Sequence, residues 1–102
     1  MSRIEALTEM LSQDPGNAFA RYGLAIEYSN SGQLKQAIEE FQKLLAAHPD
    51  YTAGYFMAAQ TLAKCDRRDD AVKTLQAGIL TAQRKGDAHA ESEMQAMLDE
   101  MV

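Results

Sequence analysis

The feature that most constrains the fold of this chain is an internal period of 34 residues. Its two prolines, Pro15 and Pro49, lie one period apart, and an apolar pair precedes each of them by the same interval. The same step brings small residues onto small ones and large onto large ones, as in Ala25 with Ala59, Ala37 with Ala71, and Phe41 with Leu75. A period of this length is typical of a repeat protein, in which each unit buries its apolar face by stacking on its neighbours.

Each period is predicted to contain two helices. Apolar side chains recur at three- and four-residue spacings on both sides of Gly32, and no segment alternates polar and apolar residues as a strand would. Gly32 and Pro49 are typical of helix ends, because glycine adopts the left-handed backbone and proline lacks an amide hydrogen. Asn17 and Asp87 stand where helix N-caps are expected. We therefore expect six helices: one over 2–12, two within 18–49, and three over 51–64, 69–84 and 88–101.

At these residues the chain resembles the tetratricopeptide repeat family, whose unit is a 34-residue helical hairpin. The family's signature positions in the first repeat, residues 18–51, hold Leu24, Ala25, Tyr28, Gly32, Ala37, Phe41, Leu44 and Pro49. The second repeat, residues 52–85, matches at Tyr55, Ala58, Ala59, Leu62, Ala71 and Leu75. It departs at Asp66 and Gln83, where the family favours glycine and proline.

The resemblance covers residues 3–85. Residues 2–12 align with the second helix of a half-repeat, and residues 87–101 are expected to form a C-terminal capping helix outside the resemblance. The resemblance implies one all-α domain, residues 1–102, folded as a right-handed superhelix of helical hairpins, a helical solenoid.

The resemblance also implies a concave groove, lined by the first helix of each hairpin, in which family members commonly bind peptides. The groove positions of this chain would be Phe19, Tyr22, Ile26, Phe56, Met57 and Gln60, with Ser29, Ala53 and Lys64 beside them. Members that grip an acidic C-terminal carboxylate of chaperones use Lys, Arg and Asn where Tyr22, Ile26 and Met57 stand here, which argues against a carboxylate clamp. An apolar groove selects an apolar helix face or an extended segment, so we expect a protein or peptide partner.

The last helix carries an apolar stripe at helical spacing, made of Met94, Met97, Leu98 and Met101. Apolar stripes are usually core, and a repeat stack needs an amphipathic end helix, so we favour a capping role for this helix. It is also the nearest segment that could cover the groove, and the sequence leaves open whether it does. Methionine adapts to varied surfaces, which leaves a second hypothesis open. In that hypothesis the chain is a structural homodimer or larger assembly, and the groove or the methionine stripe is buried against another copy.

The last helix also concentrates acidic residues without any Lys or Arg: Asp87, Glu91, Glu93, Asp99 and Glu100. A solvated outer face beside the basic residues of the second repeat is the favoured interpretation. The alternative is an acidic patch that steers a basic partner.

Composition and the scarcity of reactive side chains argue against other functions. With 10 Lys+Arg against 15 Asp+Glu, the net charge of −5 opposes binding to phosphate backbones, so we expect no nucleic-acid partner. No apolar run approaches the roughly 18 residues of a membrane span, and the N-terminus lacks the apolar core of a signal peptide. His48, His89 and Cys65 stand in no catalytic or metal-binding constellation, so we expect a non-catalytic protein without metal or cofactor. The single cysteine favours a reducing compartment, and hence the cytoplasm.

Overall fold

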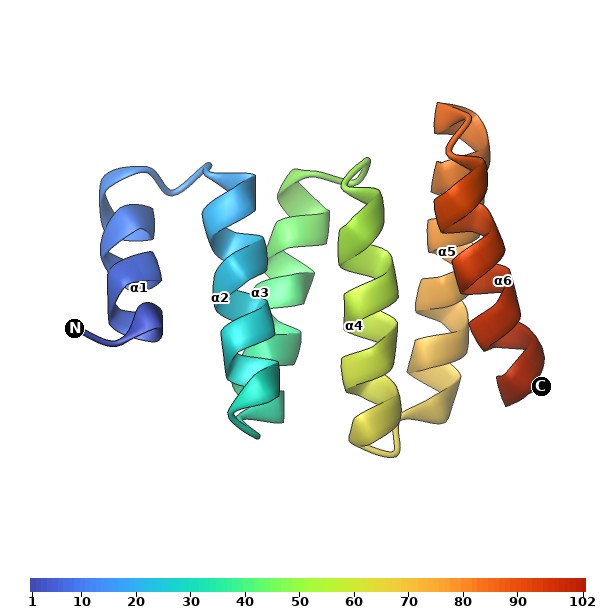
Figure 1. The fold of residues 1–102 in the computed structure, drawn as a ribbon, viewed down its shortest axis with the longest axis horizontal. Helices are drawn as coiled ribbons and strands as arrows, with labels where there is room; N and C mark the ends of the chain where they lie inside the picture. Colours follow the sequence, from blue (N-terminus) through green and yellow to red (C-terminus); the bar gives the residue numbers. More distant parts are fainter.

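The computed structural model describes residues 1–102 and contains six helices and no strand. The helices are α1 (Arg3–Gln13), α2 (Ala18–Asn30), α3 (Leu34–Ala47), α4 (Thr52–Lys64), α5 (Arg68–Lys85) and α6 (Ala88–Met101). They stand side by side along the longest dimension of a molecule measuring 40 × 29 × 19 Å (Figure 1). This arrangement confirms the all-α helical-hairpin solenoid and the six helices expected from the periodicity.

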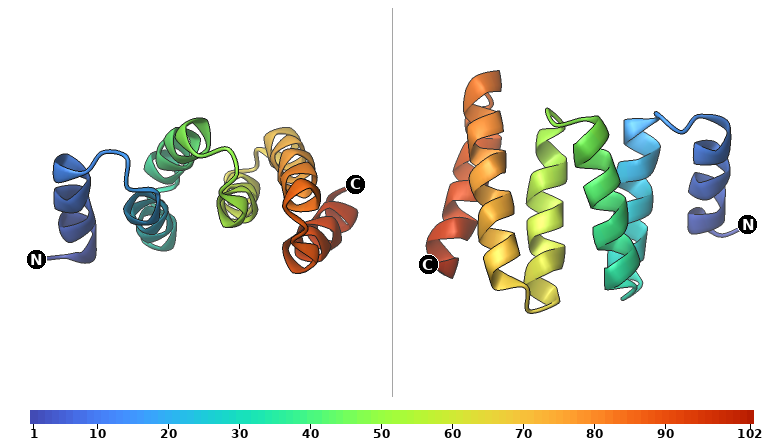
Figure 2. Two further views of the ribbon diagram at one scale, coloured as in Figure 1. Left: turned by 90° about the horizontal axis from the view of Figure 1, so that it is seen from above. Right: turned by 180° about the vertical axis from the view of Figure 1, so that it is seen from behind.

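The helices form two layers, with α1, α3 and α5 in one and α2, α4 and α6 in the other (Figure 2). Every helix packs against the next one along the chain, and in the second layer α2 also contacts α4 and α4 contacts α6. In the first layer, by contrast, no Cα atoms of α3 and α5 lie within 8 Å of each other. The layer of α2, α4 and α6 is therefore the more tightly spaced one, and we call it the inner layer.

Short polar side chains cap the helix N-termini, and glycine stops a helix, where the sequence predicts. Asn17 accepts a hydrogen bond from the backbone N–H of Ala20, and Asp87 accepts one from Ala90, so both are N-caps as expected. Gly86 ends α5 in the left-handed conformation, with φ of +70°. Sequence reasoning missed the reciprocal capping box of Ser2 and Glu5 at the start of α1.

The turns of the two hairpins use different residues for the same backbone conformation. Gly32 has φ of +81° in the first hairpin, and Asp66, one period later, has φ of +59° in the second. Aspartate is one of the few non-glycine residues that enters this region, at an energetic cost that glycine avoids. The departure from the family pattern at Asp66 thus changes the residue and leaves the turn in place.

The two helices of each hairpin cross at small residues. Ala25 of α2 and Ala37 of α3 have no exposed surface, and neither do Ala59 of α4 and Ala71 of α5. Larger side chains at these positions would force the paired helices apart. Phe41, 1% exposed, fills the space between the first hairpin and α4 together with Leu44 and Ala58.

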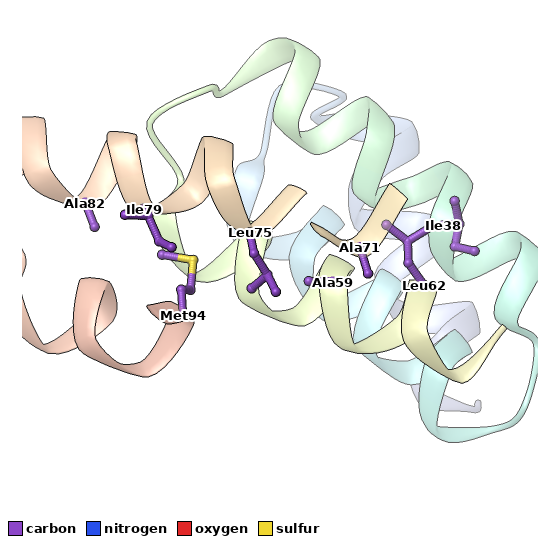
Figure 3. Packing of buried hydrophobic residues seen from close by; sticks show 8 residues of the cluster. All are labelled: Ile38, Ala59, Leu62, Ala71, Leu75, Ile79, Ala82 and Met94. Carbon is purple, nitrogen blue, oxygen red and sulfur yellow. The ribbon is translucent and has the colours of Figure 1, made fainter. Parts of the chain in front are cut away.

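The closest approach in the C-terminal half occurs at Gly78 of α5. A Cβ atom there would lie 2.5 Å from Sδ of Met94 and 2.6 Å from Cβ of Tyr55, so only glycine lets α4 and α6 pack against α5 at this point. Met94 is fully buried and reaches from α6 toward Ile79 in a cluster that also includes Leu75 (Figure 3). α6 is thereby held against α5 and α4.

Candidate peptide-binding groove

A hollow of about 310 Å³ opens on the inner layer and is lined by residues of α2, α4 and α6. Tyr22 of α2 forms one wall, and four residues of α4 (Thr52, Ala53, Phe56 and Met57) form the floor. The other wall comes from α6 and its N-cap, through Asp87, His89, Ala90, Glu93 and Met94. We call this hollow the groove. It brings together Tyr22, Ala53, Phe56 and Met57, four of the side chains that the sequence analysis assigned to the concave face.

Five other residues predicted for the concave face belong to the same layer but do not line the groove: Phe19, Ile26, Ser29, Gln60 and Lys64. Phe19 stands at the first turn of α2 with 71% of its surface exposed. Ile26 and Gln60 are partly buried farther along α2 and α4. Ser29 is buried, and its hydroxyl lies 3.1 Å from that of Thr61. Because the Thr61 hydroxyl donates to the Met57 carbonyl at 2.9 Å, Ser29 is the donor, and the pair joins α2 to α4 beneath the surface.

A second tyrosine, which sequence reasoning did not assign to the groove, supports its α2 wall. The rings of Tyr22 and Tyr51 lie with their centroids 5.2 Å apart at an interplanar angle of 45°. Burial raises the pKa of Tyr22 above its ordinary value of 10.0, and the neighbouring Tyr51 raises it further; burial alone raises that of Tyr51. The tilted aromatic pair therefore orients Tyr22 before any ligand arrives.

α6 forms a wall of the groove and does not cover it, which answers a question that the sequence left open. It contacts α5 and α4 but not α2, which leaves Tyr22 open to the groove. Its apolar stripe is turned toward the core: Met94 is fully buried, and Met97, Leu98 and Met101 are partly buried against the same cluster.

The opposite face of α6 is polar, through Glu91, Ser92, Gln95 and Asp99. No acidic side chain of α6 or its N-cap forms an ion pair with a lysine or arginine. Glu93 lies 3.2 Å from Nε2 of His89, and Glu91 accepts a hydrogen bond from Gln83 at 2.8 Å. The basic residues of α5 thus do not neutralise this helix.

Two further candidate side chains, His48 and Cys65, stand at the C-terminal ends of helices. His48 is the C-cap of α3, and its Nε2 donates to the Gly16 carbonyl at 3.1 Å, which ties the end of the first hairpin to the preceding turn. Cys65 is the C-cap of α4 and is partly buried. No three His, Cys, Asp or Glu side chains lie close enough to hold a metal ion. None of the six helices combines the length and apolar character that a membrane span requires.

Comparison with known proteins identifies the fold family. A sequence profile described as tetratricopeptide repeat (TPR) matches residues 30–98. A TPR repeat-containing protein of Pseudomonas aeruginosa is 32% identical over 95 residues, which cover 93% of this chain and 90% of that protein. The chain belongs to the TPR family.

Two solved TPR structures are similar to it. The TPR domain protein of Salinibacter ruber is 32% identical, with 86% of this chain and 89% of that chain covered and a TM-score of 0.81. The TPR2B domain of yeast Sti1, solved as a complex with pHsp70, is 18% identical and shares the fold, with coverage of 96% and 78% and a TM-score of 0.90.

The TPR match corrects one boundary of the sequence analysis, which ended the resemblance at residue 85. The matched segment continues to Leu98 and so includes most of α6. The physical reason is a shift in spacing: α4 begins 34 residues after α2, but α6 begins 36 residues after α4. The shift arises because α5, with 18 residues, is four residues longer than α3, while the connection after it is two residues shorter. With the longer step, the fully buried Met94 stands at the position equivalent to Ala58, and α6 packs on α5 and α4 as α4 packs on α3 and α2.

Proposed function

We propose that this TPR protein binds a segment of a polypeptide partner in the groove, without catalysing a reaction. The observation that carries the proposal is that Tyr22 and Phe56, from two successive repeats, present partly exposed aromatic surface to one hollow that no segment of the chain fills. Concave, mostly apolar hollows with a few polar groups are the usual form of binding sites. TPR domains act as protein-interaction modules, and the Sti1 TPR2B domain in its complex with pHsp70 supports the same role here.

The composition of the groove argues for an apolar segment and against an acidic one. Its lining contains two aromatic rings, two thioethers and small side chains, with two carboxylates and one imidazole on the α6 wall, and it contains no lysine or arginine. An acidic terminus would find no cation to pair with, and its carboxylates would lose water without compensation. A peptide that places an apolar side chain over Phe56 and Met57 gains from the burial of both surfaces.

The alternative is that the groove is buried against a second copy of the chain. The polar outer face of α6 argues against end-to-end stacking through that helix, since a repeat partner would require an apolar face there. Light scattering over a concentration series tests this alternative. A monomer at all concentrations supports an external partner, whereas a dimer that persists on dilution favours self-association.

Selection from a phage-displayed library of random dodecapeptides tests the proposal directly. We expect peptides that bind the wild-type protein and lose binding to the double variant Tyr22→Glu/Phe56→Glu, because two carboxylates in the groove would repel apolar side chains. Leu80→Glu is the matched control: Leu80 is 58% exposed on α5, away from the groove, and this variant should bind as the wild type does. Circular dichroism of all variants checks that helicity is kept. Peptides that bind the double variant as tightly as the wild type would refute the groove as the site.

Cytoplasmic location and the absence of a nucleic-acid partner form part of the same proposal. They rest on the single cysteine, Cys65, and on the net charge of −5.

A further inference from the structure

The charged groups of the groove are all on one wall and of one sign. Asp87 and Glu93, with the intervening His89, stand on the α6 side, and neither the floor nor the α2 wall contributes a charge. The groove therefore combines an apolar floor with an electronegative wall.

No lysine or arginine forms an ion pair with either carboxylate, although Lys85 lines an adjoining hollow together with Asp87. Oδ1 of Asp87 accepts from the Ala90 N–H at 3.0 Å, and Glu93 has only the imidazole of His89 beside it. Lys85, the nearest lysine along the chain, donates instead to the Asp50 carbonyl at 2.8 Å. With the whole chain at −5, both the local and the long-range field attract a cationic partner and repel an anionic one.

The opposite wall and the floor supply aromatic surface facing these carboxylates. Tyr22 is held in place by its contact with Tyr51, and Phe56 lies between Tyr22 and the α6 wall on the floor of the groove. A guanidinium group is planar and weakly hydrated, so it stacks on aromatic rings while its N–H groups pair with a carboxylate. A lysine ammonium makes the charge interaction but lacks the planar surface for stacking.

We propose that the groove recognises an arginine within an apolar polypeptide segment, with the guanidinium between Glu93 and the rings of Tyr22 and Phe56. This inference rests on the proposed function and adds the chemistry of the partner. The neighbouring apolar side chains of the segment lie over Met57, and Asp87 adds to the field without direct pairing because its carboxylate caps α6.

The test starts from the tightest groove-dependent peptide of the selection described above. Its Kd and those of its Arg→Lys, Arg→Gln and Arg→Glu versions are measured by isothermal titration calorimetry against three proteins. These are the wild type, Glu93→Gln, and Glu100→Gln, which removes the same charge from the same helix outside the groove. We expect Arg→Gln to weaken binding to the wild type and to Glu100→Gln by about fivefold, and Arg→Glu by more. Against Glu93→Gln the loss for Arg→Gln should shrink to about twofold.

The outcomes separate this inference from the proposed function. A tightest groove-dependent peptide without arginine, or one that binds equally well with glutamine or lysine in its place, overturns the inference and leaves groove binding intact. An equal Arg→Gln loss against Glu93→Gln and the wild type also overturns it, because Glu93 would then not be the partner of the guanidinium. Peptides insensitive to Tyr22→Glu/Phe56→Glu overturn both.

Discussion

Replacing Gly78 by alanine should destabilise the protein, although the change improves the intrinsic preference of α5 for helix. Alanine in a helix interior is favoured over glycine by about 1 kcal/mol. The added methyl, however, would lie 2.5 Å from Sδ of Met94 and 2.6 Å from Cβ of Tyr55, and ordinary contact begins at 3.4 Å. The Met94 side chain can rotate away, but Cβ of Tyr55 is fixed to the α4 backbone, so α4 and α5 must separate by roughly 0.8 Å. Overpacking of this kind costs about 1 to 3 kcal/mol, which leaves a net destabilisation of up to about 2 kcal/mol.

Two other helical glycines provide matched controls. A Cβ at Gly23 of α2 would meet Leu7 at an ordinary 3.5 Å, so Gly23→Ala should raise the free energy of unfolding by up to about 1 kcal/mol. A Cβ at Gly54 of α4 would lie 3.0 Å from the flexible methyl ends of Leu44 and Leu45, so gain and cost should nearly cancel.

Urea denaturation followed by circular dichroism measures all three variants, with the free energy of unfolding taken from the midpoint and slope. The expected order of stability is Gly23→Ala, then Gly54→Ala near the wild type, then Gly78→Ala. If Gly78→Ala raises the free energy of unfolding as Gly23→Ala does, the helices at this crossing are not as close as the structure has them, and the reasoning is refuted.

Three further predictions concern the core, a turn and the aromatic pair. Phe41→Ala should lower the free energy of unfolding by about 3 to 5 kcal/mol, because Phe41 is 1% exposed; an unchanged urea midpoint would contradict this. Asp66→Gly should raise the free energy of unfolding by about 0.5 kcal/mol, and with it the thermal midpoint, because Asp66 has φ of +59°. Gly32→Asp should lower the thermal midpoint. Opposite signs would show that the two turns are not equivalent. The raised pKa values of Tyr22 and Tyr51 mean that the folded chain holds their protons more tightly than the unfolded chain, so their contribution is complete below pH 10 and is lost as pH rises through the folded pKa. Urea midpoints between pH 8 and pH 11 should therefore fall less for Tyr22→Phe/Tyr51→Phe than for the wild type, and an equal fall would exclude this cause.

The secondary structure of the chain was predictable because its causes are local. The apolar spacing of α3, the N-caps Asn17 and Asp87, and the glycine stops at Gly32 and Gly86 each act within one or two turns of a helix, so they can be recognised along the sequence. The buried alanines at the hairpin crossings were also predictable, because the repeat places them at equivalent positions in both hairpins.

The candidate site was predictable only in part, because a groove depends on distances between helices. Tyr22, Phe56 and Met57 line the hollow, but Phe19 at the start of α2 and the buried Ser29 do not, although all five belong to the same layer. Helical periodicity indicates the face on which a side chain lies. It does not indicate how far a neighbouring helix extends over that face.

The position of α6 shows most clearly what only the tertiary structure decided. The sequence analysis excluded this helix from the repeats by residue type, because α6 begins two residues later than the 34-residue step and its residues therefore do not match at that step. In the structure Met94 packs against Gly78, and α6 in this position contributes Asp87 and Glu93 to the groove. The sequence by itself determined the helices, their ends and the repeat. The tertiary structure decided where the last helix lies. Because Gly78 has no side chain, α6 packs closely against α5 and α4, and in that position it forms a wall of the candidate site and does not cover it.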